Sequence, residues 1–302
     1  MSKIYSYAFH RVSDEYSPAY PPMPIKTFAK VVRFLNRKHL IIPQEELCEK
    51  TNFQSRKSLC VITFDDAYYD FAECALPVLE KSNIPVALHI ISDVADTGKI
   101  FWTQRLNKVI EGYYAEKKIL KLCDSQSGDL LQFSMNCDAD VERTALNVYL
   151  NLLKNPNRDA IISDLERELG REVVQTRMLR WNEIAQLDSN LVSIGSHTKT
   201  HRNLMTLSDE EIKTELSESY NCIYRNLGKY PYSIAYPNGQ YNDKINEIAL
   251  AAGYKVLYTC DAKPVVENNN CIYHRYNLYN REFWKNRLKI DMFRLEVRFC
   301  HF

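Results

Sequence analysis

The sequence lacks the features that would place this protein in a membrane or outside the cell. It contains no run of 18 apolar residues, the length that indicates a membrane-spanning helix. Its first five residues, MSKIY, lack the apolar segment of a signal peptide. The nine cysteines are odd in number and include no CxxC pair, so we expect mostly buried, reduced thiols. These absences predict a cytoplasmic protein.

Net charge is also nearly absent. The 302 residues include 39 lysines and arginines against 38 aspartates and glutamates, a formal charge of +1. No basic stripe is present, which argues against nucleic acid as a partner. The sequence has no repeats and no low-complexity linker, and 45% hydrophobic with 25% charged residues is ordinary for a globular protein. We expect one large domain that includes the whole chain, residues 1–302.

What is present is an alternation of short β-rich runs with longer helical patterns. We expect strands at residues 4–9, 60–64, 85–91, 191–195, 233–236 and 255–259, and helices at 26–36, 71–81, 208–226 and 242–252. This order predicts an α/β fold with a mostly parallel sheet, either open and doubly wound or closed into a barrel. Residues 103–176 break the alternation, and we interpret them as a helical insertion with no strand. Residues 281–302 form an amphipathic, basic C-terminal tail.

Two groups of polar residues follow predicted strands. Asp65 and Asp66 come directly after the apolar run 60–64, and His197 and His201 follow the run 191–195. Each pair alone has an ordinary explanation, a helix cap or turn for the aspartates and chance for the histidines. Because functional residues of parallel α/β folds collect beyond the C-terminal strand ends, we expect the two pairs to meet. One carboxylate with two histidines is a typical catalytic zinc site, and the remaining carboxylate is free to act as a base. The pattern predicts metal-assisted hydrolysis.

The motifs around these residues resemble the polysaccharide deacetylase family, the NodB homology domains of carbohydrate esterase family 4. The resemblance is carried by TFDDA at 63–67, HTKTH at 197–201 and AYPNG at 235–239, with FHRV at 9–12 and MLRWNEI at 178–184 in support. It implies a distorted (β/α) barrel that removes an N-acetyl or similar acyl group from an amino sugar. It also implies a divalent metal, Zn²⁺ first and Co²⁺, Ni²⁺ or Mn²⁺ as alternatives.

The resemblance assigns roles to individual residues. Asp66, His197 and His201 would bind the metal, and Asp65 would be the general base. The metal and a backbone N–H near Asn238 would hold the oxyanion. The general acid stays open between His274 and His10, with Arg275 as the competing key residue at the late motif. His39, His89 and His301 have no motif context and are interpreted as structural or surface residues. The predicted substrate-binding residues are Tyr236, Pro237, Asn238, Gly239 and Arg275.

Two positions depart from the family pattern. Ala67 stands where the first motif usually has glycine, so alanine would strain the loop if the position requires a positive φ. Ala235 stands where many members have an arginine that orients the catalytic aspartate. The base must then be oriented by another group.

The resulting hypothesis is a cytoplasmic, metal-dependent deacylase of an N-acylated amino sugar, acting during surface-glycan assembly. One alternative is a deformylase or deacylase of a lipid-linked aminosugar. Another is a catalytically impaired glycan-binding protein on the same fold. The C-terminal tail either contacts the inner face of the membrane peripherally or docks as a terminal helix on the barrel.

Overall fold

The computed structural model describes residues 4–47, 57–124, 127–170, 176–187, 190–260 and 271–299, with side chains described up to Arg294 in the last range. The chain divides into two compact units. The larger comprises residues 1–14, 23–98 and 177–302, and the smaller comprises residues 15–22 and 99–176. Within the described ranges, no helix has the length and apolar character needed to cross a bilayer.

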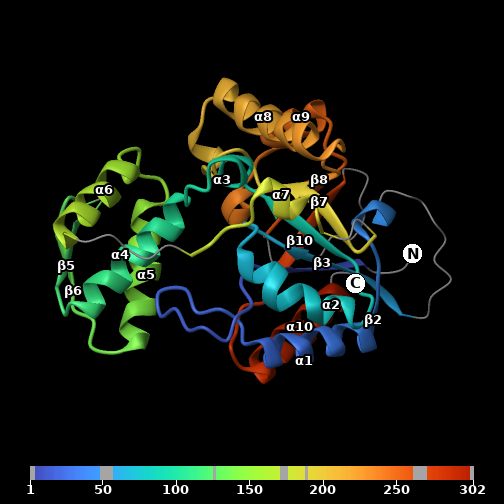
Figure 1. The fold of residues 1–302 in the computed structure, drawn as a ribbon, viewed down its shortest axis with the longest axis horizontal. Coiled ribbons are helices and arrows are strands. Elements are labelled where there is room, and N and C mark those ends of the chain that lie inside the picture. Colours follow the sequence, from blue (N-terminus) through green and yellow to red (C-terminus); the bar gives the residue numbers. More distant parts are fainter. Residues whose placement is uncertain are drawn as a thin grey trace. The chain divides into compact units, whose positions relative to one another are not determined.

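A closed barrel of seven parallel strands forms the larger unit (Figure 1). Each barrel strand pairs with the next one along the chain, and the last pairs with the first. The strands, in order, are β1 (Ile4–Phe9), β3 (Ser58–Phe64), β4 (Val86–Ile90), β7 (Val192–Ser196), β8 (Ser233–Ala235), β9 (Val256–Thr259) and β10 (Ile272–Asn277). The predicted barrel is confirmed.

One additional strand distorts the barrel. β2 (His39–Ile41) pairs with the first half of β3, whereas β4 joins the same edge of β3 only at Thr63 and Phe64. The sequence prediction missed β2 and β10. The β10 sequence, IYHRYN, contains histidine, arginine and asparagine among its six residues. It therefore has no apolar run to indicate a strand.

Helices surround the barrel, as expected for parallel strands that are buried on both faces. They are α1 (Ile25–Lys38), η1 (Gln44–Leu47), η2 (Phe71–Ala75), α2 (Leu76–Glu80), α3 (Ser92–Thr97), α7 (Trp181–Ile184), η3 (Leu204–Thr206), α8 (Asp209–Leu227), η4 (Pro237–Gly239), α9 (Asp243–Ala252) and α10 (Phe283–Phe299). The predicted capping box of α8 is present, with Ser208 and Glu211 bonded reciprocally, and Gly228 ends the helix in the left-handed conformation.

Alternate residues of each strand point into the barrel, so its contents can be deduced from the sequence of the strands. Leu59, Val61, Val256, Tyr258 and Tyr273 belong to one cluster of buried side chains. Two residues further along β3 and β10, the inward positions hold the polar residues Thr63 and Arg275. The barrel interior is therefore apolar toward the N-terminal strand ends and polar near the C-terminal strand ends.

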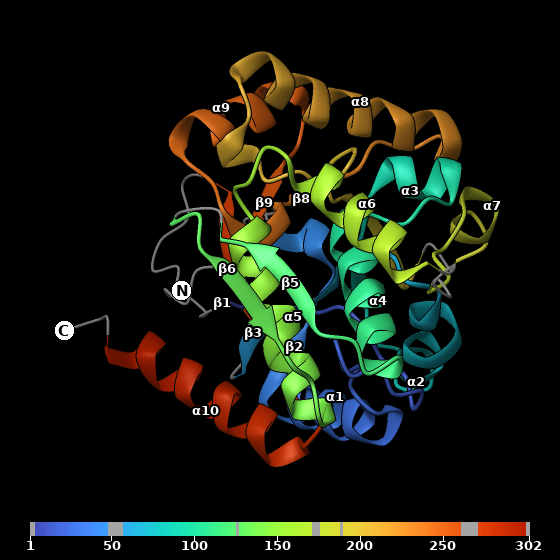
Figure 2. The same ribbon diagram turned by 90° about the vertical axis from the view of Figure 1, so that its left-hand side faces the viewer.

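The smaller unit has its own buried apolar cluster. It contains α4 (Trp102–Ala115), β5 (Leu120–Cys123), β6 (Leu130–Phe133), α5 (Asp138–Leu152) and α6 (Arg158–Leu169). The predicted insertion of residues 103–176 falls within this unit. The expectation that it has no strand was wrong, because β5 and β6 pair as an antiparallel hairpin (Figure 2). At four residues each, these strands are too short for a clear alternating pattern.

Candidate active site

Three side chains that could ligate a metal converge at the C-terminal end of the barrel. The Asp66 Oδ1 atom lies 3.4 Å from His197 Nε2 and 3.6 Å from His201 Nε2. All three residues are buried, and the three ligand atoms lie within 4.8 Å of one another. The predicted pairing of the two motifs is therefore present in the structure.

The local chemistry of this trio fits a divalent cation. Asp66 Oδ1 is buried and accepts no hydrogen bond from any residue that the structure describes. Burial together with the nearby Asp65 charge raises the Asp66 pKa well above its usual value. His197 Nδ1 donates to the Ala235 carbonyl oxygen at 2.7 Å, which leaves Nε2 unprotonated and aimed at Asp66. Burial lowers the His197 pKa to about 4, so this imidazole is neutral. A buried carboxylate facing two imidazole nitrogens is an arrangement that a bound cation stabilises.

The loop that carries the two histidines is held in an unusual backbone conformation. Thr198 and His201 both have positive φ values, 66° and 59°. The Glu215 carboxylate on α8 accepts hydrogen bonds from the backbone N–H groups of Lys199 and Thr200, at 3.0 and 2.9 Å, and from the Thr200 hydroxyl. Left-handed conformations of this kind persist only where surrounding contacts stabilise them. Glu215 supplies such contacts, and the sequence motif did not indicate it.

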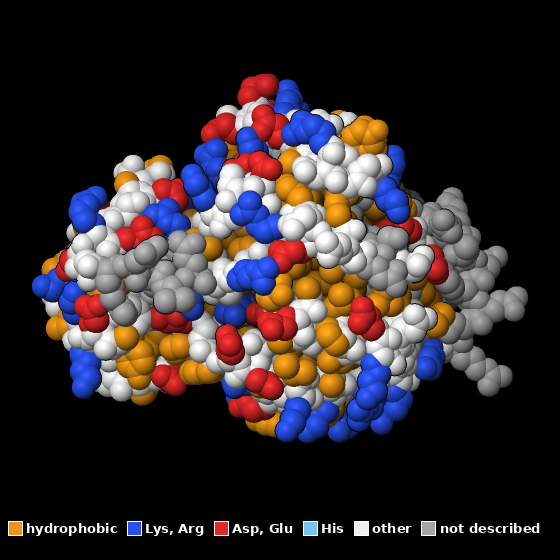
Figure 3. Space-filling view, in the orientation of Figure 1, with side chains coloured by type: hydrophobic (Ala, Val, Ile, Leu, Met, Phe, Trp, Pro, Cys, Tyr) orange, Lys and Arg blue, Asp and Glu red, His pale blue; other side chains and the backbone are white. Residues whose placement is uncertain are grey.

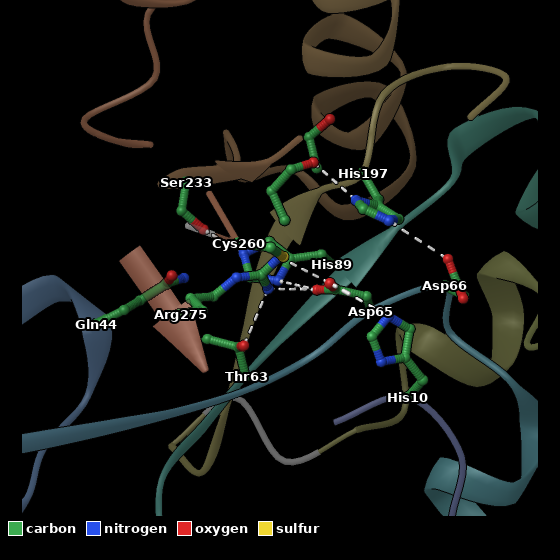
Figure 4. Close-up of polar contacts among 12 residues, drawn as sticks. His10, Gln44, Thr63, Asp65, Asp66, His89, His197, Ser233, Cys260 and Arg275 are labelled. Carbon is green, nitrogen blue, oxygen red and sulfur yellow. Dashed lines mark hydrogen bonds and ion pairs between the residues drawn. The ribbon is translucent and has the colours of Figure 1, made fainter. Parts of the chain in front are cut away.

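Asp65 lies within a separate network of buried polar groups (Figure 4). Arg275 on β10 donates to both of its oxygens, from Nη1 to Oδ1 at 2.7 Å and from Nη2 to Oδ2 at 2.8 Å. His89 Nδ1 lies 3.0 Å from Oδ1, and the other nitrogen of His89 lies 2.9 Å from Ser233 Oγ. Burial opposes ionisation of Asp65, but Arg275, His197 and His89 hold its pKa well below the usual value. Asp65 is therefore ionised and fixed in orientation.

Arg275 orients Asp65 in place of the arginine that many family members have at the position of Ala235. The missing arginine of the third motif is replaced by one from β10, two strands further along the chain. The predicted substrate-binding role does not fit Arg275, because its side chain is fully buried and bonded to Asp65 and Thr63. Its place is beneath Asp65, where it can orient the carboxylate.

His89 is a second site residue that sequence reasoning missed. It lies on β4 among apolar neighbours, the pattern of an ordinary core histidine. One signal was available in Gly195 on β7. A Cβ atom at that position would lie 2.4 Å from His89 Cδ2 and 2.6 Å from Ser233 Oγ. Glycine is needed there because the imidazole occupies the space of a side chain.

The two candidate general acids differ in position. His10, directly after β1, places Nε2 3.8 Å from Asp65 Oδ2, and its side chain is 22% exposed. His274 precedes Arg275 on β10 and therefore points to the opposite face of the strand. Its Nδ1 atom lies 2.5 Å from Thr259 Oγ1, and its ring packs near Tyr241. The structure brings His10, and not His274, to Asp65.

The AYPNG segment begins with the last residue of β8 and continues into the turn after it. Asn238 has φ +60°, and Gly239 has φ +67° and lies so close to Cys260 that a Cβ atom would clash at 2.4 Å. The Tyr236 side chain is fully buried and donates to Asn246 Oδ1 at 2.9 Å. Tyr236 therefore stabilises the turn from the core side, which does not fit the predicted contact with substrate.

The first motif contains two consecutive left-handed residues, Asp66 with φ 72° and Ala67 with φ 58°. The condition under which Ala67 would strain the loop is thus met. Backbone hydrogen bonds to residues at the start of the MLRWNEI segment, and just before it, hold the loop. Leu179 N–H donates to the Ala67 carbonyl at 3.0 Å, and Tyr69 N–H donates to the Arg177 carbonyl at 3.0 Å.

Comparison with known proteins adds a family resemblance to this geometry. Residues 138–257, less than half of the chain, match the family model described as polysaccharide deacetylase. This match confirms the predicted resemblance to that family and the predicted enzyme class, hydrolases of non-peptide carbon–nitrogen bonds. No curated protein sequence matches the chain.

Several solved structures share the fold. A Streptococcus pyogenes deacetylase, PplD in complex with acetate, is 16% identical with a TM-score of 0.61, covering 95% of this chain and 97% of that one. IcaB from Ammonifex degensii is 14% identical with a TM-score of 0.61, covering 98% of both chains. A de-N-acetylase from Aggregatibacter actinomycetemcomitans is 15% identical with a TM-score of 0.55, covering 94% and 99%.

Proposed function

We propose that this protein is a metal-dependent N-deacetylase of an amino sugar in a glycan or glycan precursor. The observation that carries the proposal is the position of Asp65. This ionised, oriented carboxylate lies beside three buried groups that fit a divalent cation. A retained fold without catalysis would not require an uncompensated Asp66 or a buried arginine beneath Asp65.

Each residue has a proposed task. Asp66, His197 and His201 would hold the cation, Zn²⁺ being the first candidate for this set of O and N donors. When bound, it would supply Lewis acidity that activates water and polarises the amide carbonyl. Asp65 would accept the proton of the attacking water. A backbone N–H in the turn at Asn238 would donate to the developing oxyanion.

His10 would donate the proton to the departing amine. It is near Asp65 and partly exposed, so an incoming amide can reach it. Arg275 and His89 would act through Asp65: they keep it ionised and fix its rotation. This arrangement gives a base that is always available, although a low pKa makes it intrinsically weak. Activation of water at the cation site would compensate for that weakness.

The cellular setting is part of the proposal. Cys60, Cys123, Cys137, Cys222 and Cys260 are free thiols, two of them exposed, which favours a reducing compartment such as the cytoplasm. A substrate met there would be a precursor of a surface glycan. The exposed apolar residues of α10, including Trp284, favour a second candidate, a lipid-linked aminosugar that carries an acetyl or formyl group.

Metal analysis combined with acyl release tests the proposal. Purified protein loaded with Zn²⁺ should contain about one ion per chain and release acetate from N-acetylglucosamine oligomers or a lipid-linked N-acetyl sugar. Formate release from an N-formyl sugar would identify the deformylase instead. Asp65→Asn should keep the metal, and its kcat should fall by a factor of about 10² to 10⁴. His197→Ala should lose both the bound metal and the acyl-releasing activity.

Asp243→Asn, an exposed carboxylate in the first turn of α9, is the matched control and should change neither metal content nor rate. A protein that binds no metal and releases no acyl group would favour the alternative of a glycan-binding protein with impaired catalysis. The departures at Ala67 and Ala235 motivate that alternative.

A further inference from the structure

The outer face of α1 consists of cations, so the expectation that the chain has no basic stripe was wrong. Lys26, Lys30, Arg33 and Arg37 are all exposed and follow the spacing i, i+4, i+7 and i+11, which places them on one side of the helix. The helix contains no acidic residue. Lys and Arg side chains gather over α1 along the lower right edge of the space-filling view (Figure 3).

The neighbouring helix α10 presents an apolar crest. Trp284, Leu288 and Met292 are 61%, 54% and 47% exposed, and their four-residue spacing aligns them along the outer surface. The opposite side of the helix is buried through Ile290 and Phe293. The alternative of a docked terminal helix is therefore what the structure contains, yet docking leaves these three large apolar side chains in water.

Cations flank this crest on both sides. On one side, Lys285 and Lys289 come directly after the crest residues Trp284 and Leu288 in the sequence. On the side toward α1, the Arg287 guanidinium packs over the Phe34 ring at 5.6 Å. Thr27 of α1 donates to the Arg281 carbonyl at 2.8 Å, which ties the two helices together. We call this continuous surface of α1 and α10 the α1–α10 face.

The charge of the α1–α10 face contrasts with that of the chain. Residues 25–38 and 281–294 contain ten lysines and arginines but only two acidic residues, Glu282 and Asp291. The whole chain carries only +1. Both acids are within 4 Å of cations of the same face, Glu282 with Lys285 and Asp291 with Arg287 and Arg294. The excess of positive charge is therefore concentrated on one side.

We propose that the α1–α10 face binds the surface of an anionic lipid bilayer. The crest would insert at the level of the headgroups, where tryptophan is favoured. The flanking lysines and arginines would extend their charged ends to lipid phosphates. This inference goes beyond the proposed catalytic function and does not depend on it.

The combination of groups favours a bilayer over other partners. A second copy of the chain would bring two strongly positive faces together, which like-charge repulsion disfavours. A nucleic acid would match the cations but would leave the apolar crest facing a charged backbone. An anionic bilayer matches both, because its interface offers phosphates at the surface and an apolar layer directly below.

Sedimentation with lipid vesicles tests the proposal. The full chain should bind vesicles of phosphatidylcholine with 30% phosphatidylglycerol, and should bind pure phosphatidylcholine far more weakly. Lys30→Gln with Arg33→Gln should lower the partition coefficient about 25-fold, or about fivefold for each cation. Trp284→Ser with Leu288→Ser should lower it at least about tenfold. Leu150→Ser, which removes a leucine that is 57% exposed on α5, should leave it unchanged.

Tryptophan fluorescence distinguishes insertion from adsorption by charge alone. Trp102 is buried and Trp181 partly buried, so Trp284 is the exposed one of the three tryptophans. Anionic vesicles should shift the emission to shorter wavelength, and Trp284→Phe should abolish the shift. The proposal is overturned if anionic vesicles do not bind, if the serine variants bind like wild type, or if Leu150→Ser loses as much binding as they do. Vesicle binding and acyl release are measured separately, so either can fail alone.

Discussion

The buried pair of Asp65 and Arg275 allows a quantitative test of how the catalytic carboxylate is held. The side chains are 2% and 0% exposed, and two hydrogen bonds of 2.7 and 2.8 Å join them. Removing one partner of such a pair leaves an uncompensated buried charge and costs about 3 to 5 kcal/mol. Because whole domains are stable by only about 5 to 15 kcal/mol, Arg275→Met should unfold in far less urea than wild type.

A double-mutant cycle separates this charge effect from lost packing. Asp65→Asn in the Arg275→Met background removes the stranded carboxylate, so the double variant should be more stable than Arg275→Met alone. We expect a coupling energy of at least about 2 kcal/mol, measured by urea unfolding with a chelator present in every sample. The exposed pair of Glu210 and Lys213 on α8, 2.8 Å apart, is the control and should show no measurable coupling. Additive effects for Asp65 and Arg275 would mean that no stranded charge destabilises Arg275→Met.

Four further changes test other parts of the site and fold. Ala67→Gly should raise the free energy of unfolding by about 0.5 to 1 kcal/mol in urea titrations, because φ is +58° there. Gly195→Ala should lower it by about 1 to 3 kcal/mol and reduce kcat more than KM, because the new methyl group displaces His89. Glu215→Gln should weaken zinc affinity in competition titrations by about 10- to 100-fold, since it loosens the histidine loop. His39 should make stability fall as pH drops from about 6.5 to about 3, and His39→Asn should flatten that fall.

The sign of the His39 effect follows from its burial. Burial first, then the charges of Arg294, Lys38 and Lys57, lower its pKa in the folded protein to about 3. The unfolded chain takes up the proton near pH 6.5 and the folded one does not, so acid favours unfolding. The slope lost in the variant is at most about 1.4 kcal/mol per pH unit. An unchanged slope would contradict this account.

Control substitutions distinguish these predictions from general sensitivity to mutation. Ala249→Gly, inside α9, should destabilise by about 1 kcal/mol, opposite in sign to Ala67→Gly. If both glycine variants lose stability equally, the left-handed backbone at Ala67 is not strained. If Gly195→Ala leaves KM unchanged and lowers the apparent kcat only in proportion to the folded protein that is lost, His89 has no positioning role. If Glu215→Gln binds zinc like wild type, the loop is held by other contacts.

Catalytic and metal-ligating residues could be predicted from the sequence where they follow an apolar strand. Asp65 and Asp66 could be found because they come directly after the largely apolar run 60–64, and His197 and His201 because they follow the run 191–195. His89 could not, because a histidine within an apolar strand has the same pattern whether it packs or positions a carboxylate. Periodicity says which face it occupies but not what lies opposite.

The replacement of the missing arginine was beyond the sequence for a related reason. Nothing near Ala235 indicates Arg275, which reaches Asp65 only because β9 and β10 continue the barrel and β10 closes it against β1. β10 itself has no apolar run, so neither the strand nor the inward direction of Arg275 could be predicted. Closure of the barrel depends on contacts between residues far apart in the sequence. The pairing of Arg275 with Asp65 depends on this closure.

A crystal structure of the zinc-soaked protein, with an anomalous map at the zinc edge, decides whether Asp66, His197 and His201 form the metal site. We expect one strong peak at about 2.0 to 2.2 Å from Asp66 Oδ1, His197 Nε2 and His201 Nε2, with Asp65 still paired with Arg275. A peak bound by other residues, or saturating zinc with no peak among these three atoms, would contradict it.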